Sequence, residues 1–104
     1  MVRMTTQVIE AHVVGEGEWL AVTEVCRMCH LELEAVHEVA ALGLVTPRER
    51  RGEWQLPAAA LARLRTVSRL MHDLGVNVSG AVLAVELLER IHELEQRSAG
   101  GADH

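Results

Sequence analysis

The sequence predicts a mainly α-helical protein with a small β component, in which a winged helix-turn-helix is followed by two long helices. Three observations support this fold class. Two apolar stripes at helical spacing flank a turn in residues 23–43, two strand-like segments surround a charged turn in residues 44–56, and two longer amphipathic segments cover residues 58–74 and 78–97. With 104 residues, 49% of them hydrophobic, the chain can build one small core. We therefore expect a single domain over residues 1–97.

The helix-turn-helix begins with a short helix expected over residues 24–29. Thr23 can cap this helix through its side-chain oxygen. His30 occupies the turn, since histidine tolerates a left-handed backbone better than most residues. The second helix covers about residues 32–42, and Gly43 can adopt the left-handed conformation that ends it. Its apolar face is expected to comprise Leu33, Val36, Val39 and Ala40.

The β component is expected in two places. Residues 44–56 predict a wing, with two short strands around a charged loop at residues 48–52. Residues 7–22 predict a hairpin, with one strand at residues 7–14 and a second at residues 18–22. The sequence leaves open whether this hairpin pairs with the wing.

The two long helices have clear boundary signals. The helix over residues 58–74 ends at Gly75, and Asn77 or Ser79 can cap the last helix. After this helix, residues 98–104 are expected to form a disordered polar tail. The apolar face of the first long helix is expected to comprise Leu61, Leu64, Val67, Leu70 or Met71, and Leu74.

The last helix carries an apolar stripe with three- and four-residue steps over about two heptads. The pairs Glu86 with Arg90 and Glu93 with Arg97 flank it in the favourable order. Two heptads are too few for a free-standing coiled coil, so this helix either packs on its own domain or pairs with a second chain. The residues expected to pair two chains are Ala84, Leu87, Leu88, Ile91 and Leu94.

The charge of the chain argues against DNA binding. The net charge is −5, and the second helix of the helix-turn-helix contains no Arg or Lys. A helix that reads the major groove must offer cations to phosphates and donors to base edges, whereas carboxylates repel a polyanion. The cations near the wing and on the first long helix are interpreted as a solvated surface, with residual phosphate binding as the alternative. They are Arg48, Arg50, Arg51, Arg63, Arg65 and Arg69.

Cys26-Arg27-Met28-Cys29-His30 has the form of a c-type haem attachment site. Such attachment needs an oxidising compartment, and the chain starts without the continuous apolar stretch of a signal peptide. We interpret both cysteines as packing residues. Zinc binding with His30 and His37 and a redox pair remain alternatives, although no second cysteine pair completes a four-ligand set. We expect no bound metal and no cofactor.

No enzyme class is indicated. The remaining histidines are scattered, the paired carboxylates lie on helices that read as solvent-facing, and no phosphate-binding glycine loop is present. No apolar segment has the length of a membrane span. We therefore expect a cytoplasmic protein that is not an enzyme and does not contact membranes.

Several motifs together resemble the bacterial chaperone-modulator family CbpM, which is MerR-like. They are Leu42-Gly43-Leu44-Val45-Thr46-Pro47, the wing residue Trp54, Arg63-Leu64-Arg65, Asp73-Leu74-Gly75-Val76-Asn77 and Leu87-Leu88-Glu89-Arg90-Ile91. The resemblance covers about residues 19–97. The chain departs from the family at His30, where such turns usually carry glycine.

The resemblance implies a homodimer that binds the J-domain of a CbpA- or DnaJ-type co-chaperone and inhibits its stimulation of Hsp70. From charge and expected exposure, we predict that the partner-binding residues are Glu24, Glu32, Glu34, His37 and Glu38. Two alternatives remain. One is a MerR-like transcription regulator that binds DNA through its wing and the helix that carries Arg63, Arg65 and Arg69. The other is a metal-sensing regulator that uses Cys26, Cys29 and His30.

Overall fold

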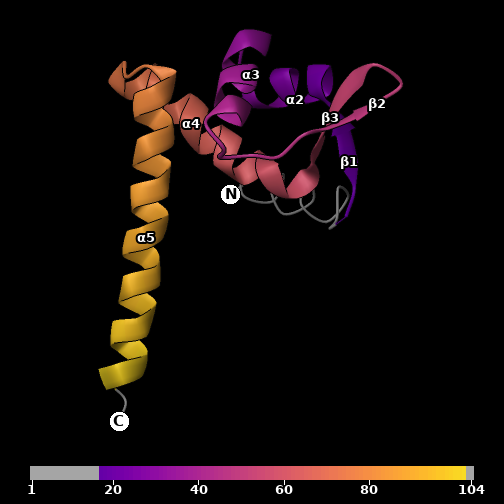
Figure 1. Cartoon of the computed structure of the whole chain (residues 1–104). Helices are drawn as coiled ribbons and strands as arrows, with labels where there is room; N and C mark the ends of the chain where they lie inside the picture. Colours follow the sequence, from indigo (N-terminus) through magenta and orange to yellow (C-terminus); the bar gives the residue numbers. More distant parts are fainter. Residues whose placement is uncertain (1–16, 103–104) are drawn as a thin grey trace, which may run out of the picture.

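The computed structural model describes residues 17–102. In chain order its elements are β1 (Trp19–Ala21), α2 (Val22–Cys29), α3 (Leu33–Ala41), β2 (Arg48–Arg50), β3 (Glu53–Pro57), the short 3₁₀ helix η1 (Ala58–Ala60), α4 (Leu61–Leu74) and α5 (Val78–Ala102) (Figure 1). The expectation of a mainly α-helical fold with a small β component is confirmed. The strand expected at residues 7–14 lies outside the described residues.

The small sheet contains three strands in the order β1-β3-β2, and both pairings are antiparallel. The strand expected at residues 18–22 therefore pairs with the wing, which the sequence had left open. Because side chains alternate along a strand, Leu20, Trp54 and Leu56 share one face of the sheet. Leu56 is fully buried, so this face covers the core. The residues expected to form the charged loop are mostly strand, since β2 starts at Arg48.

The helix-turn-helix differs from expectation at its start. Thr23 does not cap α2, because the helix begins at Val22 and Ala21 is the extended residue before it, with no side-chain cap. Ala21 also ends β1, so the chain passes directly from sheet to helix and Thr23 lies within the first turn. His30 has the left-handed conformation that the sequence predicted, with φ 57° and ψ 47°.

The end of α3 confirms the role predicted for Gly43, whose φ is +89°. Its N–H donates to the carbonyl oxygen of Ala40 at 3.0 Å, and the Leu44 N–H donates to the Val39 oxygen at 3.2 Å. This pair of bonds is a Schellman motif, which satisfies carbonyls that the helix end would leave open. It also turns the chain towards the wing.

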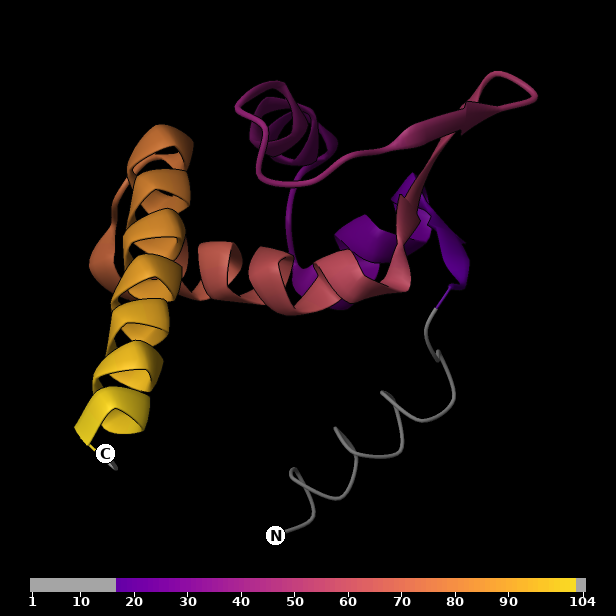
Figure 2. The ribbon, with the colours of Figure 1, turned by 60° about the horizontal axis from the view of Figure 1, so that its bottom comes forward.

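Helix α4 follows the sheet in the chain and runs beneath α3 (Figure 2). Leu61, Leu64 and Val67 are buried, as their spacing predicted. Leu74 was expected on the same face but is 68% exposed, because it is the last residue of α4 and directly precedes the left-handed turn at Gly75. Ser68 is buried, and its hydroxyl donates to the carbonyl oxygen of His30 over 3.4 Å.

Helix α5 packs on the domain only at its beginning. The buried residues there are Val78, Ala81, Val82 and Val85, and beyond them the helix extends away from the other elements (Figures 1 and 2). Asn77 caps it, since the Gly80 N–H donates to Asn77 Oδ1 at 2.8 Å. The disordered tail was expected from residue 98, but residues 98–102 continue the helix because no proline or left-handed residue interrupts it.

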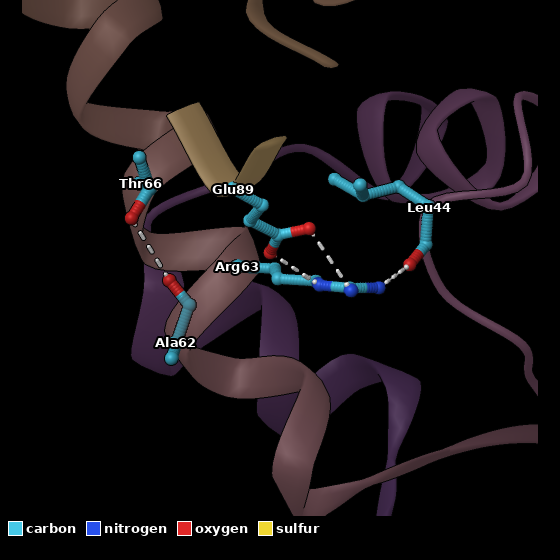
Figure 3. Close-up of polar contacts among 5 residues, drawn as sticks. All are labelled: Leu44, Ala62, Arg63, Thr66 and Glu89. Carbon is cyan, nitrogen blue, oxygen red and sulfur yellow. Dashed lines mark hydrogen bonds and ion pairs between the residues drawn. The ribbon is translucent and has the colours of Figure 1, made fainter. Parts of the chain in front are cut away.

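An arginine joins three parts of the fold (Figure 3). Arg63 of α4 binds Glu89 of α5 through two contacts, Nε to Oε2 at 2.8 Å and Nη2 to Oε1 at 3.1 Å. Its Nη1 also donates to the carbonyl oxygen of Leu44, just after α3, at 2.6 Å. The sequence had placed Arg63 in a solvated or phosphate-binding surface. The structure instead uses it to hold α4, α5 and the end of α3 together.

The left-handed turn at His30 yields a stability prediction. We expect His30→Gly to raise the free energy of unfolding by roughly 0.5–1 kcal/mol, because glycine removes the steric cost of a side chain in this conformation. The His30 side chain is exposed, so little packing is lost. His30→Val is the control and should destabilise the protein, since a β-branched residue is strained there. Chemical denaturation measures both variants, and equal stability of all three proteins would contradict the prediction.

Candidate protein-binding site

The exposed half of α3 consists of two rows of side chains spaced four residues apart. One row contains Leu33, His37 and Ala41, and the other contains Glu34 and Glu38 and ends at Leu42. We call these the wing-side row and the acidic row. The buried half of α3 comprises Ala35, Val36 and Val39. Leu33 was expected in the buried stripe but is 45% exposed, because it is the first helical residue and lies at the edge of that stripe.

The wing-side row contacts the wing. The His37 ring lies 4.2 Å from the ring of Trp54, centroid to centroid, at an interplanar angle of 51°. Trp54 belongs to β3 and is half-buried against the core. Sequence reasoning used Trp54 only as a family motif and missed this contact, because nothing local indicates which helix faces the strand. Through this contact, the wing lies along one side of α3.

The acidic row forms no ion pair with the part of the chain that the structure describes. Within residues 17–102, no ion pair joins Glu34 or Glu38 to a basic side chain. Both carboxylates are exposed, and α3 itself contains no Arg or Lys. These two glutamates therefore present negative charge to solvent. They lie with His37 on the exposed surface of α3.

The other two predicted residues lie apart from this surface. Glu24 is on α2 and forms an ion pair with Arg27, which offsets its charge. Glu32 precedes α3 and lines a hollow of about 590 Å³ at the turn of the helix-turn-helix. Leu33, the first residue of the wing-side row, also lines this hollow. The full lining comprises Thr23, Cys26, Arg27, His30, Leu31, Glu32 and Leu33.

Two basic residues of the wing, Arg48 and Arg50, lie on the sheet face opposite Trp54, which contacts α3. Arg48 shares the sheet face opposite Trp54, its guanidinium carbon lies 4.2 Å above the Trp19 ring, and its Nε donates to Gln55 Oε1 at 2.9 Å. This cation–π contact and hydrogen bond hold Arg48 on the sheet. Arg51 sits in the two-residue turn at the tip, with φ 55°. The wing and α3 thus present opposite charges on different surfaces.

The two cysteines have different environments. Cys29 is 2% exposed and belongs to the core, whereas Cys26 is half-buried beside it. Burial raises the pKa of the Cys26 thiol, the nearby Glu32 carboxylate raises it further, and a backbone hydrogen bond lowers it. A raised pKa disfavours the thiolate that metal binding and redox exchange require. Among the described residues, no group of three or more His, Cys, Asp or Glu side chains is placed to hold a metal ion.

The apolar stripe of α5 is exposed over most of its length. Leu87, Leu88, Ile91 and Leu94 are each about half exposed, whereas Ala84 is half-buried. Internal packing of this helix therefore covers only its beginning. Leu83 is also 56% exposed and extends the stripe, although sequence reasoning omitted it.

A groove of about 480 Å³ runs beside this stripe, between α4 and α5. Leu88, Val85 and Ala62 contribute its apolar lining, and the Arg63–Glu89 pair lies at its edge. Within the described chain, Arg90 pairs with Glu93 at 3.0 Å and not with Glu86, although three- and four-residue spacings both bring side chains together on a helix.

Among the described residues, no helix combines the length and apolarity that crossing a membrane requires.

Comparison with known proteins gives consistent similarities. Residues 20–100 match the family model described as MerR HTH family regulatory protein. A chaperone modulatory protein CbpM from Coxiella burnetii is 28% identical over 95 residues, which cover 90% of this chain and 90% of the relative. A CbpM from Escherichia coli O139:H28 is 30% identical over 78 residues, which cover 74% of this chain and 77% of the relative. Both descriptions denote regulators rather than enzymes.

The environment of Cys26 predicts its reactivity. We expect Cys26 to react slowly with iodoacetamide at neutral pH, because its raised pKa keeps the thiol protonated. Glu32→Gln should shift the pH profile of alkylation towards lower pH, since it removes the negative charge that opposes the thiolate. Mass spectrometry of the alkylated chain separates Cys26 from the more buried Cys29. Glu34→Gln is the control, and an equal shift in both variants would contradict a local effect of Glu32.

Proposed function

The chain belongs to the CbpM family of chaperone modulatory proteins, which has the MerR helix-turn-helix, and we propose that it binds the J-domain of a CbpA- or DnaJ-type co-chaperone. Binding would inhibit stimulation of Hsp70 by that co-chaperone in the cytoplasm. The proposed contact surface is α3 with its acidic row, flanked by Glu32 and, more weakly, by the ion-paired Glu24.

The observation that supports this proposal most is the charge of α3. In a DNA-binding helix-turn-helix the second helix lies in the major groove, among phosphates. Glu34 and Glu38 are exposed there and have no basic partner among residues 17–102, so they oppose DNA and favour a cationic protein surface. The family resemblance implies such a surface, because J-domains carry a basic second helix.

The proposed mechanism is competition. The basic second helix of a J-domain, with the adjacent His-Pro-Asp loop, engages Hsp70. A protein that covers this helix would block the stimulation of Hsp70 ATPase activity. Complementary charge speeds the encounter, and apolar contacts then hold the complex. No chemical step is needed.

A DNA-binding regulator is the second candidate function, because Arg50 and Arg51 are exposed at the end of the wing. Two of the other candidate cations are less available, whereas Arg69 on α4 is exposed as well. Arg48 lies on Trp19 and bonds Gln55, and Arg63 binds Glu89. The positive charge that the wing can offer to DNA is therefore smaller than the sequence alone indicated.

We also propose that α5 pairs two copies of the chain. Half-exposed Leu87, Ile91 and Leu94 lie on a helix that leaves its own domain (Figure 1). Burying each of these side chains against a second chain gains about 1 kcal/mol or more. The groove lined by Leu88 continues this apolar surface towards α4.

Charge reversal tests the partner-binding surface. We expect Glu32→Lys/Glu34→Lys/Glu38→Lys to weaken binding to a purified J-domain at least tenfold, because three attractions become repulsions. Isothermal titration calorimetry measures the affinity, and circular dichroism checks the fold. The matched control reverses three exposed acids elsewhere, Asp73, Glu86 and Glu95.

Unaltered affinity of the α3 variant, or an equal loss in the control, would contradict this surface. Duplex DNA is titrated in parallel to test the second candidate function. A DNA-binding regulator requires measurable duplex affinity that falls steeply with added salt. We expect no duplex binding by the wild-type chain at moderate ionic strength.

Substitution in α5 tests the dimer. We expect the wild-type chain to sediment as a dimer and Leu87→Asp/Ile91→Asp to sediment as a monomer, since two buried charges have no partner at an apolar interface. Leu74→Asp alters an exposed leucine outside α5 and is the control. Analytical ultracentrifugation measures the mass, and a monomeric wild-type chain would refute the proposed pairing.

A further inference from the structure

Helix α3 exposes large apolar side chains next to its carboxylates. Leu33 and Leu42, at opposite ends of the helix-turn-helix's second helix, are both 45% exposed. The negative charge of α3 does not explain why these two leucines are exposed. Exposed apolar side chains grouped with charged ones on a small surface are typical of a protein contact.

The two rows define a groove along α3. On the surface of a helix, side chains four residues apart form ridges. The groove between two such ridges accepts a ridge from another helix. Here one ridge holds Glu34 and Glu38, and the other holds Leu33 and His37. Trp54 supports the second ridge through its 4.2 Å ring contact with His37.

We infer that this groove binds an amphipathic helix with basic residues along one edge and apolar residues along the other, and that the two rows have separate tasks. The acidic row attracts the incoming helix, and the wing-side row, in which His37 positions Leu33, holds it. This inference rests on the proposed function and assigns the contacts within it. The occupant follows from charge complementarity, because the two carboxylates lack a basic partner within the described chain.

The hollow at the turn extends the holding surface. Leu33 lines both the wing-side row and this hollow, whose volume is about 590 Å³. Cys26 and Leu31 add apolar lining, and Glu32 lies at the same place. The hollow has room for an apolar side chain of the bound helix. A basic residue next to that side chain in the bound helix would then lie near Glu32.

Because the two rows have separate tasks, their substitution should change different rates of binding. Long-range attraction acts mainly on the association rate and is screened by salt. Apolar contacts form only in the complex, so their loss acts mainly on the dissociation rate. The His37–Trp54 contact keeps the wing-side row in place, and both residues are therefore positioning residues for the bound helix.

The test measures association and dissociation rates with a purified J-domain by surface plasmon resonance at two salt concentrations. Glu34→Gln/Glu38→Gln keeps the shape of the acidic row and removes its charge. We expect association to slow about fivefold or more at low salt, a smaller effect at high salt, and unchanged dissociation. The matched control is Glu86→Gln/Glu95→Gln on α5, which should change neither rate.

Leu33→Ala tests the holding surface, because Leu33 is the large apolar side chain of the wing-side row. We expect dissociation to accelerate about tenfold, with the association rate and its salt dependence unchanged. Leu74→Ala, at another exposed leucine, is the control. Thermal unfolding checks that each variant folds as the wild type does.

The outcomes separate this inference from the proposed function. A wild-type chain that binds no J-domain overturns both. A wild-type chain that binds, with variants that leave both rates unchanged or that alter the same rate, overturns the division of tasks and leaves the proposed function standing.

Discussion

Helix α4 is the element on which the rest of this structure depends, because its buried aliphatic side chains lie where the other elements meet. Leu64 and Val67 are completely buried in a core that contains no Phe or Tyr. Interiors of this kind are close-packed, and removal of even a few methyl groups is costly. Two polar residues of α4 add contacts on either side of α3. Ser68 bonds the carbonyl of His30 before α3, and Arg63 bonds the carbonyl of Leu44 after it.

This arrangement leaves α3 free to serve as a binding surface. Val36 and Val39 fix its buried half against the core, so the opposite half must face solvent. The carboxylates on that half make no ion pair within the described chain, and removing their charge costs the fold little. Structure and recognition are therefore assigned to different faces of one short helix.

Several basic residues, in contrast to the glutamates of α3, form contacts within the chain. Arg27, Arg48 and Arg63 each have a partner within the chain, a carboxylate or an aromatic ring. Positive charge that could have reached phosphates is thus partly used in intramolecular contacts, while negative charge on α3 stays available. A helix-turn-helix frame can in this way be retained while its surface favours a protein partner over DNA. The exposed stripe of α5 adds a second, apolar surface.

The sequence by itself determined the features that depend on neighbouring residues. Helical spacing located the helices, His30 and Gly43 marked left-handed turns, and the absence of Arg and Lys made α3 acidic. Tertiary structure decided what depends on distant residues. Arg63 meets Glu89, 26 positions away, and His37 meets Trp54 of the wing, contacts that no local pattern encodes. The physical reason is that backbone conformation and charge are local properties, whereas the partner of a side chain is chosen by how whole elements pack.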